Sequence, residues 1–176
     1  MKRPVTALLL GSFLVTSCAT TAVPSTVIVA NGSLIRADGQ QAGRTELLRE
    51  GDRLYLRLTG SGFDAGTRAL HLHQQGKCDR PDFTSAGGHL NPFGKTHGKL
   101  SEMGQHLGDL PNLEIPATGS FEMTVELYGS ASKTLPQILD AEGTAVMIHA
   151  GPDDYKTDPS GAAGPRIACA VLSPTS

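Results

Sequence analysis

Residues 53–59 read Arg-Leu-Tyr-Leu-Arg-Leu-Thr, and this alternation decides the fold class. Its three leucines project to one side of an extended chain, and its two arginines and its tyrosine project to the other, which is the pattern of a half-buried β-strand. Further strand signals occur at residues 26–35, 43–50, 67–73, 121–127, 144–149 and 166–172. No stretch is a convincing amphipathic helix, so the sequence predicts an all-β domain.

The composition of the 176-residue chain agrees with one such domain. Its 21 glycines and 11 prolines suit many short strands joined by turns and long loops. Hydrophobic residues make up 39% and charged residues 18%, which permits a packed core and argues against disorder. The net charge of -2 gives no reason to expect binding to nucleic acid.

The N-terminus is predicted to be a targeting segment. Lys2 and Arg3 precede an apolar stretch at residues 5–15 that is too short to span a bilayer comfortably. The sequence Val-Thr-Ser-Cys at residues 15–18 then resembles the lipobox of bacterial lipoprotein signals, in which the cysteine is lipidated and becomes the new N-terminus. We expect a signal peptide at residues 1–18, lipidation of Cys18 and a flexible tether at residues 19–25. Cleavage as an ordinary secretory signal, a few residues further on, is the alternative.

The cysteine count fits an exported protein. An odd number of cysteines, Cys18, Cys78 and Cys169, calls for an explanation of the unpaired thiol. Lipidation of Cys18 supplies one, and an oxidising compartment allows Cys78 and Cys169 to form a disulfide. We therefore expect a periplasmic protein that is attached to a membrane through a lipid anchor. Because an alanine follows Cys18, we expect the outer membrane more than the inner one.

The histidines are placed where they could bind metal. His71 and His73 lie two apart on a predicted strand, so both project from one face, and two imidazoles can hold copper or zinc. A polar strand face is the bland alternative. His149 ends another predicted strand, directly before an irregular segment at residues 150–165.

A longer segment, residues 74–116, is glycine-rich and poor in strand signals. A loop of that length in a compact domain usually has a function or an internal staple. It contains His89, His97, His106 and Asp109, and three imidazoles with one carboxylate make a plausible tetrahedral zinc set.

At these residues the chain resembles the copper/zinc superoxide dismutase family. The matching blocks are HLH at 71–73, Cys78, TSAGGHLNP at 84–92, THG at 96–98, HLGDL at 106–110, HAGPDD at 149–154 and GPRIAC at 164–169. The spacings of eight, nine and three residues that separate His89, His97, His106 and Asp109 also match. The resemblance covers residues 26–173 and implies one domain, a flattened eight-stranded Greek-key β-barrel with a long loop for zinc and the disulfide, and a second active-site loop.

The resemblance also implies one copper and one zinc per subunit. The implied copper ligands are His71, His73, His89 and His149. The implied zinc ligands are His89, His97, His106 and Asp109, with His89 bridging the two metals as an imidazolate. Asp153 would link a copper-site histidine to a zinc-site histidine, and Cys78 and Cys169 would form the family disulfide.

The implied activity is dismutation of superoxide to oxygen and hydrogen peroxide outside the cytoplasm, as protection against oxidative stress. His89 and Arg166 would be the catalytic residues, with Arg166 at the mouth of the copper site. Ordinary roles remain open: a loop acid for Asp153, a rim salt bridge for Arg166, and a solvated lysine rather than a helper for Lys156. Monomer and homodimer are both open.

Two other functions compete with this interpretation. A non-catalytic copper- and zinc-binding lipoprotein on the same scaffold would need neither Arg166 nor a bridging His89. A plain β-sandwich adhesion module would need no clustered histidines. The chain also departs from the family pattern, because Ala69-Leu70 replaces the usual Gly-Phe before His71. We expect the larger side chain at position 69 to shift the strand slightly, and the family's guiding charge cluster is not identifiable.

Overall fold

The structure, a computed structural model, describes residues 25–175. Cys18, the expected signal peptide and nearly all of the expected tether lie outside these residues. The described part contains nine strands, one α-helix and a single 3-10 turn, η1 (Thr84–Ala86). The strands are β1 (Thr26–Arg36), β2 (Gln41–Glu50), β3 (Arg53–Gly60), β4 (Gly66–Arg68), β5 (Leu70–His73), β6 (Leu113–Ile115), β7 (Phe121–Glu126), β8 (Thr144–His149) and β9 (Arg166–Pro174).

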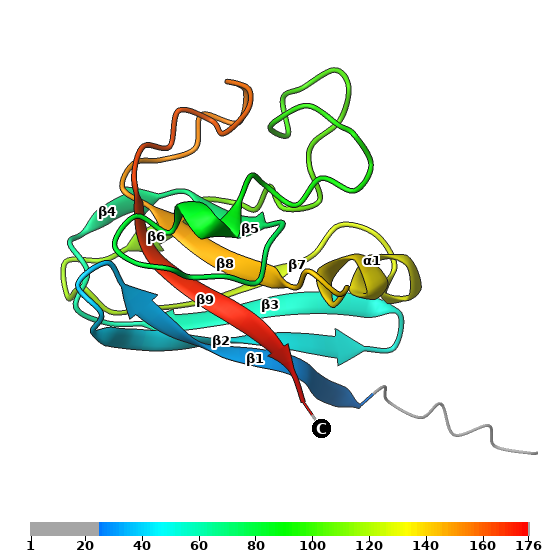
Figure 1. The fold of residues 1–176 in the computed structure, drawn as a ribbon, viewed down its shortest axis with the longest axis horizontal. Helices are drawn as coiled ribbons and strands as arrows, with labels where there is room; N and C mark the ends of the chain where they lie inside the picture. The colour runs from blue at the N-terminus through cyan, green and yellow to red at the C-terminus, as the bar shows by residue number, and fades with distance from the viewer. Residues whose placement is uncertain (1–24, 176) are drawn as a thin grey trace, which may run out of the picture.

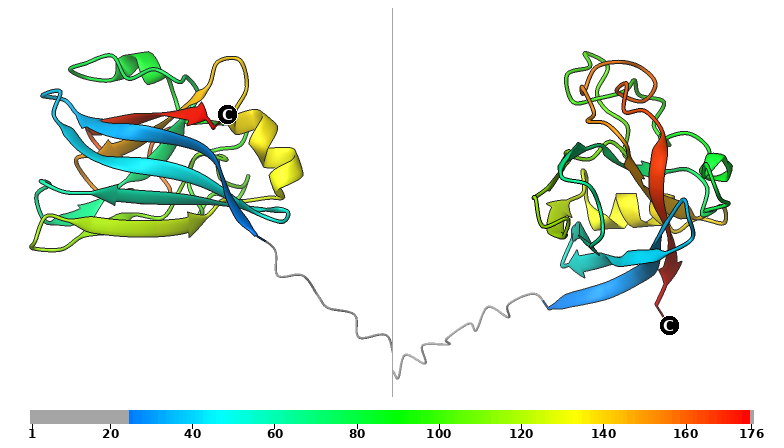
Figure 2. Two further views of the ribbon diagram at one scale, coloured as in Figure 1. Left: turned by 90° about the horizontal axis from the view of Figure 1, so that it is seen from below. Right: turned by 90° about the vertical axis from the view of Figure 1, so that its left-hand side faces the viewer.

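Seven strands form one curled antiparallel sheet in the order β5-β8-β9-β1-β2-β3-β7, and β4 pairs with β6 in a small second sheet (Figures 1 and 2). Only Ala69 separates β4 from β5, so a single interrupted strand passes from one sheet to the other. Counted in this way, the domain has eight strands. Pairs such as β3–β7 and β9–β1 join strands that are far apart in the chain, as a Greek key requires. The predicted all-β, barrel-like fold is confirmed.

The alternation that predicted β3 is visible in its packing. Its three leucines are at most 1% exposed and belong to the main core, whereas the residues between them are half-buried. β8 is different, because all six of its residues are buried. Val146 and Ile148 enter the main core, while Ala145 and Met147 pack on the opposite face with Phe83 and Cys169. The outer face of β8 is therefore covered by the loops.

One prediction about secondary structure was wrong. The chain forms a helix, α1 (Ala131–Ile138), although no convincing helix was expected. It has only eight residues and contains Pro136, which removes a backbone donor. Its buried positions are Ala131, Thr134 and Ile138, too few to make a clear periodic pattern. Strand β6 was also missed inside the segment expected to be irregular, because it has three residues.

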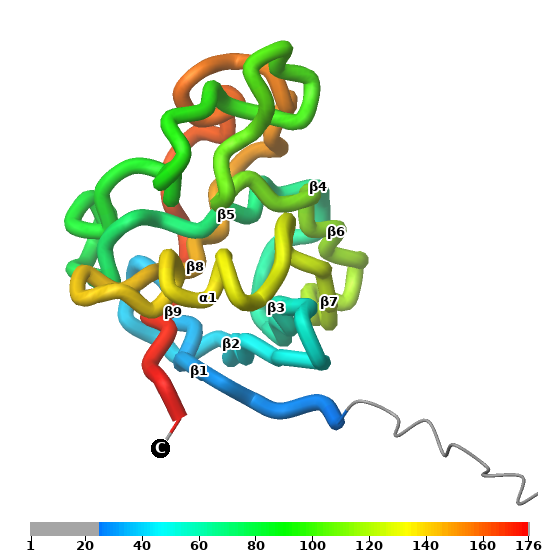
Figure 3. Tube along the Cα trace, turned by 90° about the vertical axis from the view of Figure 1, so that its right-hand side faces the viewer, coloured from blue at the N-terminus to red at the C-terminus, as the bar shows by residue number. Residues whose placement is uncertain are grey.

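The two long loops, residues 74–112 and 150–165, meet at one end of the barrel (Figures 1 and 3). Hydrogen bonds join them directly: Leu100 N donates to Tyr155 O at 3.1 Å, and His97 N donates to Asp158 Oδ1 at 2.8 Å. Among residues 25–175, no helix has the length and apolar character needed to cross a membrane.

Candidate metal centre

Strand geometry places the first histidines outside the barrel core. On β5, Leu70 and Leu72 point into the main core, so His71 and His73 point outward. β5 pairs with β8, where His149 occupies the last position and shares its outward direction with Met147. Three imidazoles are thus held by two hydrogen-bonded strands.

The long loop is fastened along the free edge of β5. Leu72 N donates to Gly108 O at 2.9 Å, Leu90 N donates to Leu72 O at 2.8 Å, and His73 forms a backbone bridge with His89. A Cβ atom at Gly108 would lie 2.3 Å from Leu72 O, so this close approach requires glycine. The loop thereby brings His89 beside the strand histidines.

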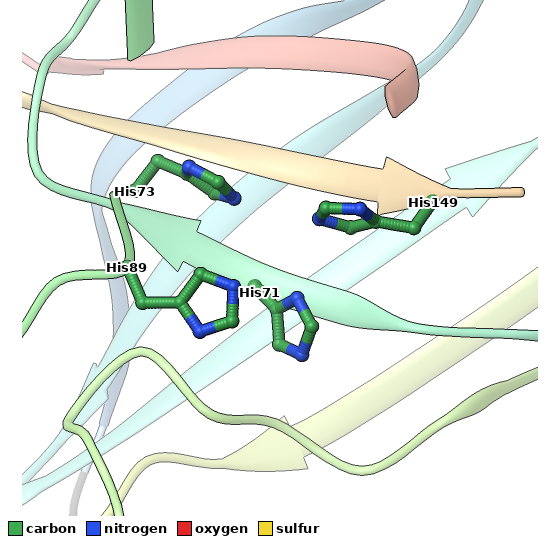
Figure 4. A group of neighbouring side chains, drawn as sticks. All are labelled: His71, His73, His89 and His149. Carbon is green, nitrogen blue, oxygen red and sulfur yellow. The ribbon is translucent and has the colours of Figure 1, made fainter. Parts of the chain in front are cut away.

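The result is a four-histidine group made of His71, His73, His89 and His149 (Figure 4). One ring nitrogen from each lies within 4.8 Å of the others, and all four residues are buried. Four ring nitrogens have no hydrogen-bond partner: His71 Nδ1, His73 Nε2, His89 Nε2 and His149 Nε2. Buried polar atoms are rarely left unpaired, so four of them in one place fit a metal ion.

The other ring nitrogen of each strand histidine is held by the protein. His73 Nδ1 lies 3.0 Å from Gly87 O, and His149 Nδ1 lies 3.1 Å from Gly164 O. His71 Nε2 lies 2.9 Å from Asp153 Oδ2. Because these oxygens accept the N–H, the lone pair of each opposite nitrogen is free to bind a metal.

A second group adjoins the four-histidine group and shares His89 with it. This three-histidine group consists of His89, His97 and His106 together with Asp109. The Nδ1 atoms of the three histidines lie 2.9, 3.1 and 3.1 Å from Asp109 Oδ1, although the bond from His97 is poorly aligned and its Nδ1 has no true hydrogen-bond partner. Ligands about 2.0 Å from a tetrahedral zinc ion lie about 3.3 Å apart. The three nitrogen–oxygen distances are near that spacing, and all four donors lie within 4.8 Å of one another.

Asp153 and His89 connect the two groups. Asp153 accepts hydrogen bonds from His71 Nε2 at Oδ2 and from His97 Nε2 at Oδ1, both at 2.9 Å. The ring of His89 presents Nε2 to the four-histidine group and Nδ1 to Asp109. Every histidine singled out in the sequence therefore lies in one connected cluster.

Burial keeps three rings of the four-histidine group neutral. It lowers the pKa of His73 to about 2, that of His149 to about 3 and that of His89 to about 4. Neutral imidazoles have free lone pairs for a metal at neutral pH.

One histidine and two carboxyls on the loops are charged instead. Burial alone would lower the pKa of His97, but the nearby carboxylates of Asp109 and Asp153 favour the protonated ring, outweigh burial and raise that pKa to about 9. Burial would likewise raise the pKa of both carboxyls, but their histidine partners hold each pKa well below its usual range. This part of the site carries the anionic charge that a divalent cation needs.

A cavity of about 540 Å³ opens onto the four-histidine group. Arg166 is the one lining residue with a permanent positive charge, and no carboxylate lines this cavity. Its Nη1 donates to Phe83 O and its Nη2 to Gly87 O, each at 2.6 Å. Burial lowers the pKa of Arg166, yet a guanidinium stays charged. It forms no ion pair within residues 25–175, unlike a structural rim arginine. Lys156 is exposed and does not line the cavity.

The disulfide Cys78–Cys169 is present, with a Cα–Cα distance of 5.8 Å. It joins the long loop to β9, and the carbonyls of Phe83 and Gly87 follow Cys78 in that loop. This pairing was predicted and is confirmed. At position 69 the alanine is fully buried, and it interrupts the strand while its backbone bonds Gly151 O and His149 N at 2.7 and 3.0 Å.

Sequence reasoning missed two residues that support the cluster, Asn112 and Tyr155. The amide of Asn112 bonds the backbone of Asp153 twice, at 2.8 and 3.0 Å, and Tyr155 Oη accepts from Asn112 N at 2.7 Å. These contacts use backbone atoms, which leave little trace in residue type. The only sequence signal was their nearness to Asp109 and Asp153.

Comparison with known proteins places this geometry in context. A family model for copper/zinc superoxide dismutase matches residues 42–172. The chain is 41% identical over 145 residues to Superoxide dismutase [Cu-Zn] 1 of Aquifex aeolicus, covering 81% of this chain and 86% of the relative. It is 38% identical over 141 residues to the Superoxide dismutase [Cu-Zn] of Caulobacter vibrioides, covering 77% and 80%.

Solved structures show the same fold. A SOD-like protein from Bacillus subtilis is 35% identical with a TM-score of 0.77, and the match covers 84% of this chain and all of the other. The Cu/Zn superoxide dismutase from Brucella abortus has a TM-score of 0.64 at 23% identity, covering 85% and 100%, so it supports the fold alone.

Proposed function

The chain belongs to the copper/zinc superoxide dismutase family, and on that basis we propose that it dismutates superoxide at the connected histidine cluster. The family uses copper and zinc. Bound copper would supply the one-electron chemistry, taking an electron from one superoxide and giving it to a second. The observation that carries the proposal is the set of four unpaired ring nitrogens facing one another beside an open cavity.

We assign copper to the four-histidine group and zinc to the three-histidine group with Asp109. An all-nitrogen set suits copper, and three nitrogens with one carboxylate oxygen suit zinc. His89 would contact both metals, through Nε2 and Nδ1. Asp153 orients His71 and His97 toward their respective metals from outside.

Arg166 would attract and orient superoxide. Its guanidinium is the fixed positive charge of the cavity, and the two carbonyls that accept from it prevent the side chain from swinging away. Superoxide dismutases are a well-known example of such electrostatic steering. Two of its five N–H donors are occupied by these carbonyls, which leaves others for a small anion.

His89 would handle a proton. Hydrogen peroxide carries two protons that superoxide lacks, so the site and the solvent must supply them. Nε2 of His89 faces the four-histidine group and has no protein partner. We assign it the role of holding one proton while its lone pair is not bound to copper and passing that proton to the reduced substrate, with Nδ1 still aimed at the three-histidine group. Solvent in the open cavity would supply the second proton.

The test is superoxide consumption by protein loaded with copper and zinc, with metal content measured on the same sample. We expect turnover that is lost in His149→Ala and retained in Lys133→Ala, whose side chain is exposed and outside the cavity. A fully metallated protein without turnover would refute the proposal in favour of a metal-storing lipoprotein. A protein that takes up no copper would refute both.

We also propose export to the periplasm, with a lipid anchor at Cys18. The basic start, apolar stretch and lipobox-like ending support this, as does a disulfide, which is typical of oxidising compartments. Mass spectrometry of the mature N-terminus should find a lipidated Cys18, and Cys18→Ser should abolish the lipid. An unmodified N-terminus beyond residue 18 would favour the ordinary secretory signal. Sedimentation of the metal-loaded protein will distinguish monomer from homodimer.

A further inference from the structure

Tyr155 lies where the two long loops meet, and it contacts the opposite loop through three different parts. Its hydroxyl accepts from Asn112 N at 2.7 Å, and its carbonyl accepts from Leu100 N at 3.1 Å. Lys99 Nζ lies 4.0 Å from the centroid of its ring, within the range of a cation–π contact. None of these atoms belongs to a candidate metal ligand.

The backbone at this point is unfavourable for tyrosine. Its φ of 61° lies in the left-handed region, which is uncommon for residues other than glycine. The opposite loop approaches very closely, because a Cβ atom at Gly98 would lie 2.0 Å from Tyr155 O. Gly98 directly follows His97. A strained residue that persists at a functional cluster indicates that its contacts outweigh the strain.

The contacts of Tyr155 lead back to Asp153 by two routes. Tyr155 N donates to Asp153 Oδ1 at 2.7 Å, the same oxygen that accepts from His97 Nε2. Asn112, whose N–H the phenol oxygen accepts, donates from Nδ2 to Asp153 O and accepts from Asp153 N. Tyr155, Asn112 and Asp153 therefore form a closed ring of hydrogen bonds that holds the backbone N–H, the backbone C=O and the carboxylate of Asp153.

We propose that Tyr155 is a positioning residue for the zinc site: it pins the two loops together and, through Asn112 and Asp153, fixes the ring of His97, thereby slowing the loss of zinc. The inference rests on the proposed assignment of His97 and Asp109 to zinc. Because Asp153 also bonds His71 Nε2, the same pin holds one ring of the four-histidine group.

The sharpest variant is Tyr155→Phe, because it removes the hydroxyl and keeps the ring over which Lys99 lies. Groups that hold metal ligands in place typically change metal affinity by about 10- to 100-fold. We expect zinc to pass from copper- and zinc-loaded Tyr155→Phe to a coloured chelator about 10-fold faster or more. Tyr128→Phe is the matched control, since Tyr128 is 75% exposed, and it should release zinc at the wild-type rate.

A second readout is the absorption and electron paramagnetic resonance spectrum of bound Cu(II). Tyr155→Phe should shift this spectrum because His71 loses part of its fixed orientation, and a loss of general stability would not by itself do so. Circular dichroism will confirm that the variant is folded. A variant that is folded, keeps zinc as the wild type does and has an unchanged copper spectrum overturns the inference.

Tyr155→Gly distinguishes the effect of the tyrosine side chain from the effect of the strained backbone. Glycine relieves the left-handed strain, so a tyrosine without a positioning role would leave zinc release unchanged or slower. If Tyr155 positions the zinc site, Tyr155→Gly should release zinc faster than Tyr155→Phe. In addition, Asn112→Ala combined with Tyr155→Phe should give less than the product of the two single effects, because both act on Asp153. Independent effects would overturn the route through Asn112.

Failure of this inference and failure of the proposed function give different results. A wild-type protein that binds no zinc refutes the assignment of the zinc site. A wild-type protein that binds zinc, with Tyr155→Phe releasing it at the same rate, refutes only the role of Tyr155.

Discussion

Gly87 O accepts two hydrogen bonds, one from His73 Nδ1 at 3.0 Å and one from Arg166 Nη2 at 2.6 Å. One backbone oxygen therefore fixes the tautomer of a ring in the four-histidine group and the direction of the guanidinium in the cavity. The positive charge and the ring stand in a set relation to each other, which a freely rotating side chain could not provide. The charge of Arg166 and its fixed position can therefore be tested with separate substitutions.

Arg166→Ala should lower the second-order rate constant for superoxide by roughly 10- to 100-fold, because the cavity loses its fixed positive charge. The rate constant of Arg166→Lys should lie between those of the wild type and Arg166→Ala, since a lysine keeps the charge but cannot bond both carbonyls. Pulse radiolysis at low and high ionic strength measures this directly. The salt dependence should weaken in Arg166→Ala.

Arg53→Ala is the control for that series, because Arg53 is exposed and pairs with Glu126 on the barrel. It should match the wild type. An unchanged rate in Arg166→Ala at full copper content would show that the guanidinium has only a structural part.

The neutral rings of His73, His89 and His149 make the metal-free protein sensitive to acid. In the folded state their pKa values are about 2, 4 and 3, whereas the unfolded chain protonates histidine near pH ~6.5. The unfolded state therefore binds more protons as the pH falls below ~6.5, and the free energy of unfolding should decrease from there toward pH ~4. Urea titrations of the metal-free protein at pH 7.5, 6 and 5 will measure the slope.

His97 acts in the opposite sense, because its raised pKa of about 9 adds stability that is present below pH ~6.5 and lost as the pH rises through 9. Below pH ~6.5 the His97 contribution no longer changes, so the loss in acid is set by the other three rings. His73→Phe should flatten the slope by removing one of the three. A stability that stays level from pH 7.5 to 5 in the metal-free wild type would contradict the burial of these rings.

At the scale of elements, the interruption between β4 and β5 shapes the approach to His71. Ala69 lies outside the ladder of β5 and bonds instead to Gly151 and His149, at the start of the second loop. Its φ is not in the left-handed region, so the position does not require glycine. The family's usual glycine is therefore not needed for this local conformation.

Ala69→Gly should lower the free energy of unfolding by about 0.5–1 kcal/mol, because glycine loses more backbone freedom on folding and removes a buried methyl group. Copper content and activity should stay at wild-type levels. Denaturant unfolding and metal analysis of the same preparation test both halves. Loss of copper from Ala69→Gly would show that the methyl group also supports the metal site.

The long strands could be predicted from sequence because each buries one face. β3, with Leu54, Leu56 and Leu58 inside, shows this most clearly. β8 was recognisable as a continuous run of β-branched and apolar residues, buried on both sides. α1 and β6 were not recognisable, since eight residues around Pro136, or three residues at 113–115, are too short for a period to emerge.

The members of the site were predictable for another reason. Loop spacing and residue type identified His89, His97, His106 and Asp109, because a tetrahedral site restricts both. The support given by Asn112 and Tyr155 was not predictable, since it depends on where backbone N–H and C=O groups fall once two separate loops have met. Only a folded chain defines those positions.

At the scale of the whole molecule, the disulfide connects residues 91 apart. It ties the segment that carries Phe83 O and Gly87 O to β9, the strand on which Arg166 stands at the first position. The disulfide therefore keeps the two carbonyls that accept from Arg166 close to the strand that carries Arg166.

Reduction of the disulfide should lower the free energy of unfolding by about 2–5 kcal/mol, since the unfolded chain regains the freedom of a long loop. Activity should also fall at full copper content, because the carbonyls that hold Arg166 become mobile. Unfolding and turnover measured with and without dithiothreitol will show this. The double variant Cys78→Ser/Cys169→Ser should resemble the reduced wild type and should not respond to the reductant.

The division of donors between strands and loops has a consequence for how the protein matures. Three of the four nitrogens proposed for copper stand on adjacent strands, β5 and β8, so that pocket comes into being with the barrel itself. The donors proposed for zinc stand on a loop and gather only when that loop settles on the edge of β5. We therefore expect an order of assembly in which the folding chain forms the copper pocket first and the zinc site afterwards, when the loop has docked.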